Sequence, residues 1–296
     1  MSQVAISHII GNNFEQAIVS ILNLIDGSLP KTANRVVIKP NLCYYWDYTT
    51  GQTTDPKFIQ ALIKILRDRL GAGIDIAIVE SDASAMKCNF AFKILGYEKL
   101  AKETGVRLVN LTEDRSRIAP VNAGKMSFRF KVPRTIDDAD FKINVTKVKY
   151  SLEGIEMACA LKNIFGCNPY PLKYKYHPIL DEVIVAINKI MNFDLAIVGG
   201  NILSGVRPKR LGLAMASRDP VSIDAVAARI AGVNKPIRYI TLAEQEGLGR
   251  TSFTCKGADL DYFISSYPRQ QIWNKILKKI YKFVVTVGLE RRLGLE

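Results

Sequence analysis

The chain has 296 residues, a formal net charge of +13 and a hydrophobic fraction of 48%. A chain of this length and apolar content can bury a large core, so general disorder is excluded. Its five cysteines include no CxxC pair, which argues against a ferredoxin-type cluster or a zinc ribbon. No apolar run reaches the length of a membrane-spanning helix, and the first residues lack a signal peptide pattern. We therefore expect a cytoplasmic protein with reduced thiols.

The positive charge favours anionic partners and is unevenly distributed along the chain. Residues 269–296 hold seven Lys or Arg against two Glu, whereas the preceding residues are only mildly basic. Aromatic residues are not interleaved with the basic ones, as they are on nucleic-acid-binding surfaces. We expect a small anionic molecule as the partner, and no nucleic acid.

Apolar runs of β type alternate with helical patterns through most of the chain. The pair Asp55-Pro56 is typical of a helix start, since an acidic N-cap is followed by proline in the first turn. Repeated β-helix-β steps predict an α/β fold with a mostly parallel sheet flanked by helices. The expected elements are helix 12–24, strand 35–39, helix 55–70, strand 74–80, helix 89–103, strand 106–111, strand 140–148, helices 153–165 and 178–192, strands 194–199 and 211–216, and helices 220–231 and 237–246.

Two segments depart from this rhythm. Residues 112–139 contain an alternation of apolar and basic residues, which predicts a small β insertion within an α/β domain spanning 1–265. Residues 266–296 carry apolar residues at three- and four-residue steps with lysines on the other faces, which predicts a basic amphipathic helix. Its Trp273 and Tyr281 suit the surface of an anionic membrane, and would make the protein peripheral there. The alternative is a helix docked on the core or on a second subunit.

Polar side chains follow three of the predicted strands at the points where they end. Lys39 and Asn41 follow the first strand, Glu80 ends the second, and Lys147 and Lys149 end the third. Ligands of parallel sheets bind beyond the carboxyl ends of the strands, so these residues predict a ligand site.

Each of these residues also has a purely structural interpretation. Lys147 and Lys149 can clamp a carboxylate or phosphate, or the strand can simply enter solvent there. Glu80 can serve as a general base, or it can pair with Lys39 on a neighbouring strand. Asn41 can orient a substrate carbonyl or cap its own loop.

Three further titratable residues are candidates in the second half of the chain. His177 precedes a predicted helix, where the helix dipole favours the neutral imidazole needed for a general base. Asp219 fits the N-cap of helix 220–231, but Asp224 lies among its apolar residues, where capping gives no reason for an acid. Cys159, Cys167 and His177 match no zinc spacing, so no metal site is predicted.

The ordered set of motifs resembles the family catalogued as domain of unknown function 362, over about residues 35–250. The resemblance adds Lys162 and Asn163 to the candidate site. Where that family has Lys-x-Lys-Thr-His, this chain has Tyr150-Ser151 after the second lysine, so the His is absent. A weaker similarity in general plan to the nickel-pincer lactate racemases bears on the fold alone. The motifs are Ile38-Lys39-Pro40-Asn41, Glu80-Ser81, Gly96-Tyr97, Lys147-Val148-Lys149, Leu161-Lys162-Asn163-Ile164-Phe165-Gly166, His177, Ser217-Arg218-Asp219-Pro220, Asp224-Ala225-Val226, Gly232 and Gly247-Leu248-Gly249.

These features together predict an enzyme that acts on a small carboxylate or phosphate by isomerisation, racemisation or group transfer. The alternative is a non-catalytic ligand-binding or accessory protein. The residues do not identify a cofactor. The catalytic candidates are His177 and Glu80, and the substrate-binding candidates are Lys39, Asn41, Lys147, Lys149, Lys162, Asn163, Asp219 and Asp224.

Overall fold

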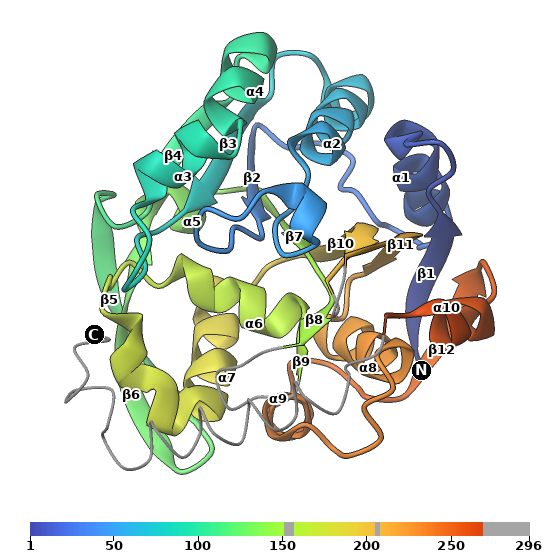
Figure 1. Ribbon diagram of the computed structural model, residues 1–296. Helices are drawn as coiled ribbons and strands as arrows, with labels where there is room; N and C mark the ends of the chain where they lie inside the picture. The colour runs from blue at the N-terminus through green and yellow to red at the C-terminus, as the bar shows by residue number, and fades with distance from the viewer. Residues whose placement is uncertain (151–156, 205–207, 269–296) are drawn as a thin grey trace.

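The computed structural model describes residues 1–150, 157–204 and 208–268 (Figure 1). Its main feature is an eight-stranded sheet in the order β12-β1-β11-β10-β7-β2-β3-β4. The strands of this sheet are β1 (Ser2–His8), β2 (Arg35–Pro40), β3 (Asp75–Glu80), β4 (Arg107–Asn110), β7 (Phe141–Thr146), β10 (Leu195–Leu203), β11 (Lys209–Ser217) and β12 (Phe253–Gly257).

The prediction of a mostly parallel sheet is confirmed. The strands from β10 to β4 run parallel to one another, and β1 and β12 form a further parallel pair. Only β11 is reversed, between β10 and β1. Because β10 ends at Leu203 and β11 begins at Lys209, their connection is too short for a parallel crossover.

Helices cover both faces of the sheet, as Figure 1 shows, with α1 to α4 on one side and α6 to α9 on the other. Along β2, Val37 packs with the second group and Ile38 with the first, which is the two-residue alternation of a strand buried on both faces. The helices are α1 (Phe14–Asn23), α2 (Pro56–Leu70), α3 (Cys88–Ile94), α4 (Tyr97–Thr104), α6 (Ala160–Ile164), α7 (Leu180–Met191), α8 (Pro220–Ile230), α9 (Arg238–Gln245) and α10 (Leu260–Ser266).

The predicted β insertion is confirmed as a hairpin outside the main sheet. Strands β5 (Ser116–Ala123) and β6 (Met126–Pro133) pair antiparallel, lie against α7 and lead into the short helix α5 (Arg134–Asp137). A second small pair joins β8 (Lys149–Tyr150) to β9 (Met157–Ala158). Short 3-10 segments complete the fold as η1 (Tyr48–Thr50), η2 (Phe165–Cys167) and η3 (Lys173–Ile179).

Two helix predictions need correction. Helix 89–103 is divided into α3 and α4 because Gly96 adopts a left-handed φ of 83° between them. The helix expected over 153–165 is reduced, in the described residues, to α6, since Met157 and Ala158 lie in β9. The helix predicted over 266–296 falls almost entirely outside the described residues. No helix in the described part of the chain is long and apolar enough to cross a membrane.

Candidate functional site

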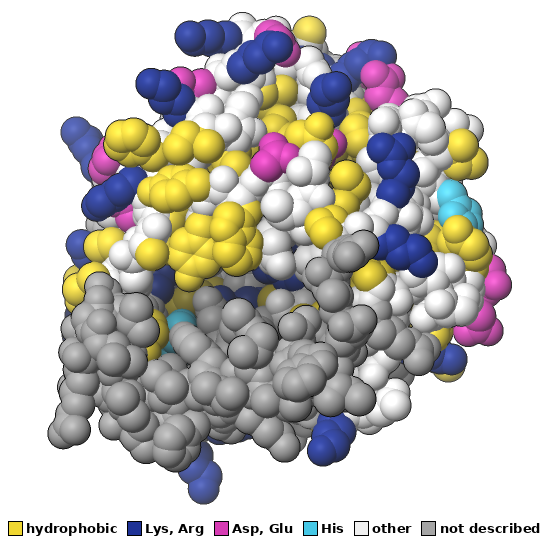
Figure 2. All heavy atoms as spheres, in the orientation of Figure 1, with side chains coloured by type: hydrophobic (Ala, Val, Ile, Leu, Met, Phe, Trp, Pro, Cys, Tyr) yellow, Lys and Arg dark blue, Asp and Glu magenta, His cyan; other side chains and the backbone are white. Residues whose placement is uncertain are grey.

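The carboxyl ends of β2, β3, β7 and β10 place several predicted site residues at one edge of the sheet. The register pairs Lys39 with Asn144 and Glu80 with Asn110, so these polar residues end their strands at similar heights. Figure 2 shows basic and His side chains on this face of the molecule, beside a group of apolar side chains. The candidate site is therefore a polar layer beneath this face.

Lys39 and Glu80 form a buried ion pair. The Lys39 Nζ lies 2.7 Å from the Glu80 Oε2, and the two side chains are 1% and 3% exposed. The backbone N–H of Ser81 donates to the other carboxylate oxygen of Glu80. A Cβ on Gly166 would lie only 2.9 Å from both side chains, so η2 closes directly over the pair. The ion pair with Lys39, one of the two interpretations of Glu80, is therefore present, and each oxygen of the Glu80 carboxylate has one described donor.

Lys173 extends this buried network and is a residue that the sequence analysis missed. Its ammonium group donates to the Ser81 hydroxyl at 2.5 Å and to the Asp82 carbonyl at 2.8 Å. The Ser81 hydroxyl also contacts the carbonyls of Gly166 and Asn168. Burial lowers the pKa of Lys173 to about 8. This network ties η2 and η3 to the end of β3.

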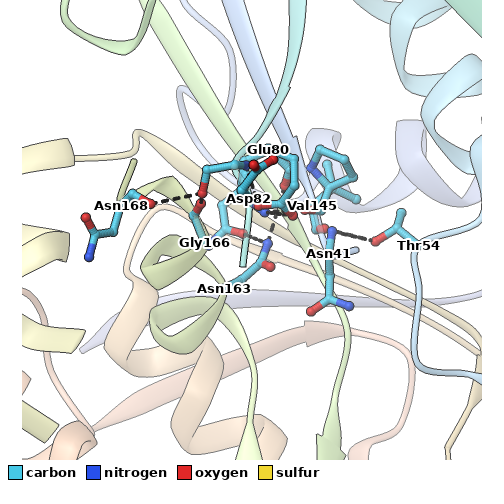
Figure 3. Close-up of polar contacts among 12 residues, drawn as sticks. Asn41, Thr54, Glu80, Asp82, Val145, Asn163, Gly166 and Asn168 are labelled. Carbon is cyan, nitrogen blue, oxygen red and sulfur yellow. Dashed lines mark hydrogen bonds and ion pairs between the residues drawn. The ribbon is translucent and has the colours of Figure 1, made fainter. Parts of the chain in front are cut away.

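Three asparagines fix the segments around the ion pair (Figure 3). The Asn163 amide donates to the Asn144 side chain at 2.7 Å, and Asn144 donates to the carbonyl of Ala160. Asn41 donates through its side chain to the Gln52 carbonyl, while its backbone N–H donates to the Thr54 hydroxyl. Asn41 therefore holds its own loop, which was one of the two interpretations of this residue.

Lys147 is buried at the end of β7 and does not enter solvent. Its Nζ lies 2.8 Å from the Gly199 carbonyl and 2.6 Å from the Ile202 carbonyl of β10, and no described carboxylate forms an ion pair with it. Burial lowers its pKa to about 7; Asp55 raises it and Lys149 lowers it further. A lysine in this state can lose or gain a proton near neutral pH.

We predict that Lys147 gives the protein a stability that rises with pH. An unfolded lysine holds its proton up to about pH 10.5, whereas folded Lys147 releases it near 7, so the folded state gains stability between these values. In Lys147→Met, the free energy of unfolding should increase less between pH 7 and pH 9.5 than in the wild type, as measured by denaturant unfolding. Lys173 has a shift of the same sign, so part of the rise should persist. Lys125→Met, at an exposed position, should leave the slope unchanged; an equal flattening there would contradict the assignment.

The remaining basic candidates lie nearer the surface. The Lys149 Nζ is 3.4 Å from the Gln52 carbonyl and is partly buried. The Lys162 Nζ lies 4.6 Å from the centre of the Phe165 ring, a cation–π contact. His177 belongs to η3, and its ring centre is 4.8 Å from that of Tyr174. Lys149 and Lys162 thus border the buried network, whereas no described contact joins His177 to Lys147 or Glu80.

Asp219 does not lie at this edge. Because β11 runs antiparallel, its end pairs with the start of β10, and Asp219 follows at the opposite edge of the sheet. The carboxylate caps α8 through the N–H groups of Val221 and Ser222 and also accepts from Ser2 and Arg250. The capping interpretation is confirmed, and the direction of β11 places Asp219 at the end of the sheet opposite to Lys39.

Asp224 has a structural role beneath the candidate site. Its fully buried carboxylate accepts from the backbone N–H groups of Ala160 and Leu161 at 2.6 and 3.2 Å, and from Tyr239 at 3.3 Å. These contacts anchor the start of α6, the helix that carries Lys162 and Asn163. The described residues contain no cluster of three or more His, Cys, Asp or Glu suited to a metal ion.

The fold and the site define an α/β protein with lysines and asparagines beneath the carboxyl edge of its sheet. The chain belongs to the family described as domain of unknown function (DUF362), whose profile matches residues 36–229. The predicted family resemblance is confirmed.

Among the known proteins that resemble the chain are a protein from a cyanobacterium and a solved bacterial structure. The chain is 25% identical over 259 residues to a thylakoid-associated protein of Synechocystis sp., covering 83% of this chain and 76% of that protein. The lactate racemase apoprotein from Thermoanaerobacterium thermosaccharolyticum superposes with a TM-score of 0.47 and 9% identity, over 79% of this chain. The chain spans 58% of that structure's length.

Proposed function

We propose that the protein binds a small carboxylate or phosphate at the carboxyl edge of its sheet, and that it acts on this ligand as an enzyme. The observation that carries the proposal is the buried Lys147, whose described contacts are two carbonyl oxygens and no carboxylate. A buried ammonium group without a contacting anion is costly, and a bound anion offsets that cost. Lys149 and Lys162, near the surface of the same edge, supply further positive charge for such a ligand.

Lys147 also fits the proton transfer that the proposed isomerisation or racemisation requires. Its pKa of about 7 lets it act as base or acid near neutral pH. Glu80 is a weaker candidate because Lys39 and Ser81 occupy its carboxylate. His177 remains a proposed second proton carrier, on the general ground that imidazole titrates in this range.

The occupied Glu80 favours the second candidate function, a protein that holds an anion without converting it. The two candidates differ in turnover alone. Proton exchange at the α-carbon of a bound carboxylate, followed by NMR in D₂O, separates them, since an isomerase or racemase accelerates this exchange and a binding protein does not.

The binding proposal predicts that particular anions raise the thermal midpoint of the protein. In a screen of small carboxylates and phosphates against their neutral amides, we expect at least one anion to raise the midpoint by several degrees. Lys149→Met should reduce this shift, and Lys147→Met should abolish it if that variant folds. Lys125→Met, on the distant β5–β6 hairpin, serves as the matched control. A screen in which no anion outperforms its neutral partner would contradict the proposal.

The thylakoid-associated relative supports a location at a membrane surface for this chain as well. The basic amphipathic helix proposed over 266–296 offers one attachment, and docking of that segment on a second subunit is its alternative.

A further inference from the structure

Exposed apolar side chains are concentrated in three segments of the described chain. Large hydrophobic residues are otherwise buried in the two core layers, and those that remain exposed are few. Most of the exposed ones share a small region, which we call the aromatic face. It consists of Tyr44, Tyr45, Trp46, Phe90, Ile94, Tyr170 and Leu172.

Hydrogen bonds hold these three segments side by side. The Tyr45 hydroxyl accepts from the backbone N–H of Lys87 at 2.8 Å, just before α3, which carries Phe90 and Ile94 one turn apart. The backbone N–H of Tyr174 in η3 donates to the Ser84 hydroxyl in the same β3–α3 loop. Figure 2 shows apolar side chains gathered over the loop after β2 and over α3.

The charges on the same segments are mainly positive. Lys87, Lys93 and Lys175 are exposed, and the Lys175 Nζ lies 3.5 Å from the centre of the Tyr170 ring. Lys87 pairs with Asp82 but keeps 71% of its side chain exposed. Two exposed acids lie in or beside these segments: the Asp47 carboxylate accepts from the Thr49 N–H, and the Glu113 carboxylate accepts from the Asn89 side chain of α3.

We propose that the aromatic face binds the surface of a bilayer containing anionic lipid. Trp and Tyr have amphipathic rings that favour the membrane–water interface, and lysines beside them attract anionic headgroups. A second copy of the chain is a poorer occupant, because lysine is depleted from the cores of protein interfaces. The aromatic face borders the candidate ligand site, so binding would bring that site against the membrane.

The tryptophan content of the chain permits a direct test. Trp46 lies in the aromatic face, and the other tryptophan is Trp273. In the full chain carrying Trp273→Phe, we expect vesicles of phosphatidylcholine and phosphatidylglycerol to shift Trp46 emission to the blue. Brominated lipid should quench that emission, and pure phosphatidylcholine should act more weakly. Vesicle flotation without any change in Trp46 emission would overturn the proposal and assign binding to another surface.

A pair of substitutions measures the contribution of the aromatic face. In the full chain, Trp46→Ser with Phe90→Ser should reduce vesicle binding about tenfold or more. The matched control is Ile118→Ser with Tyr262→Ser. These residues are 57% and 48% exposed and lie outside the aromatic face, so their substitution should leave vesicle binding unchanged. The proposal is wrong if wild-type protein binds no vesicle, or if the first pair instead dissociates a dimer. Such a failure leaves the ligand proposal intact, since that proposal is tested with soluble anions.

Discussion

Lys39→Met is expected to lower the free energy of unfolding by about 3–5 kcal/mol, the range found when one partner of a buried ion pair is removed. The Glu80 carboxylate, 3% exposed, would lose the ammonium group 2.7 Å away and would keep its bond from the Ser81 N–H. Denaturant unfolding at pH 7 measures the loss.

A surface pair of the same geometry provides the control. The Lys64 Nζ also lies 2.7 Å from a carboxylate, that of Glu15, but both side chains are about half exposed. Lys64→Met should therefore change the free energy of unfolding by less than about 1 kcal/mol. The double variant Lys39→Met with Glu80→Gln should recover part of the lost free energy of unfolding, because it leaves no unpaired charge at position 80. Equal effects of the two lysine substitutions would show that burial adds nothing to the Lys39–Glu80 pair.

Asp224→Ala should also destabilise the protein strongly, by about 2–5 kcal/mol. It leaves the buried N–H groups of Ala160 and Leu161 without their acceptor, at about 1–3 kcal/mol each. Faster hydrogen exchange at these two amides should accompany the loss, since α6 would be released at its start. Asp259→Ala, which removes an exposed N-cap from α10, is the control. It should lower the free energy of unfolding by only about 1 kcal/mol.

The pH dependence of Asp224→Ala gives a second measurement on the same variant. Burial raises the pKa of Asp224 to about 7, against 3.8 in the unfolded chain. Between these values the folded state holds a proton that the unfolded state has released, so the contribution of Asp224 falls as pH rises from about 4 to 7. The variant should lack this fall. If the difference between wild type and variant is constant across that range, the carboxyl titrates normally in the fold.

The sheet and its polar edge could be predicted because both depend on local pattern. Buried parallel strands are continuous apolar runs, and Lys39, Glu80 and Lys147 interrupt three of them where the strands end. The ends of parallel strands meet at one edge, so their proximity followed from the fold class. The confirmed N-cap of Asp219 likewise depends on neighbours in sequence.

What the sequence did not reveal depends on contacts between distant segments. Lys173 lies in a stretch rich in lysine and tyrosine that resembles a solvated surface, and its burial arises only because η3 folds over Ser81. The reversal of β11, which moves Asp219 to the other edge, leaves no trace in hydrophobic periodicity. The ion pair between Glu80 and Lys39 was one of two interpretations, and it forms because the register of β2 and β3 beneath η2 brings the two side chains together.

The position of β1 within the sheet has a consequence for how the protein acquires its fold during synthesis. Ala5 pairs with Ala216 and Val4 with Cys255, so both neighbours of β1 leave the ribosome long after β1 itself. Until then, the backbone N–H and C=O groups of β1 are unpaired on both sides, and this apolar segment can pair with other chains. Ribosome-bound chains that end before residue 209 therefore lack a partner for β1. The eight-stranded sheet is complete only after β12, near the end of the described residues, has been synthesised.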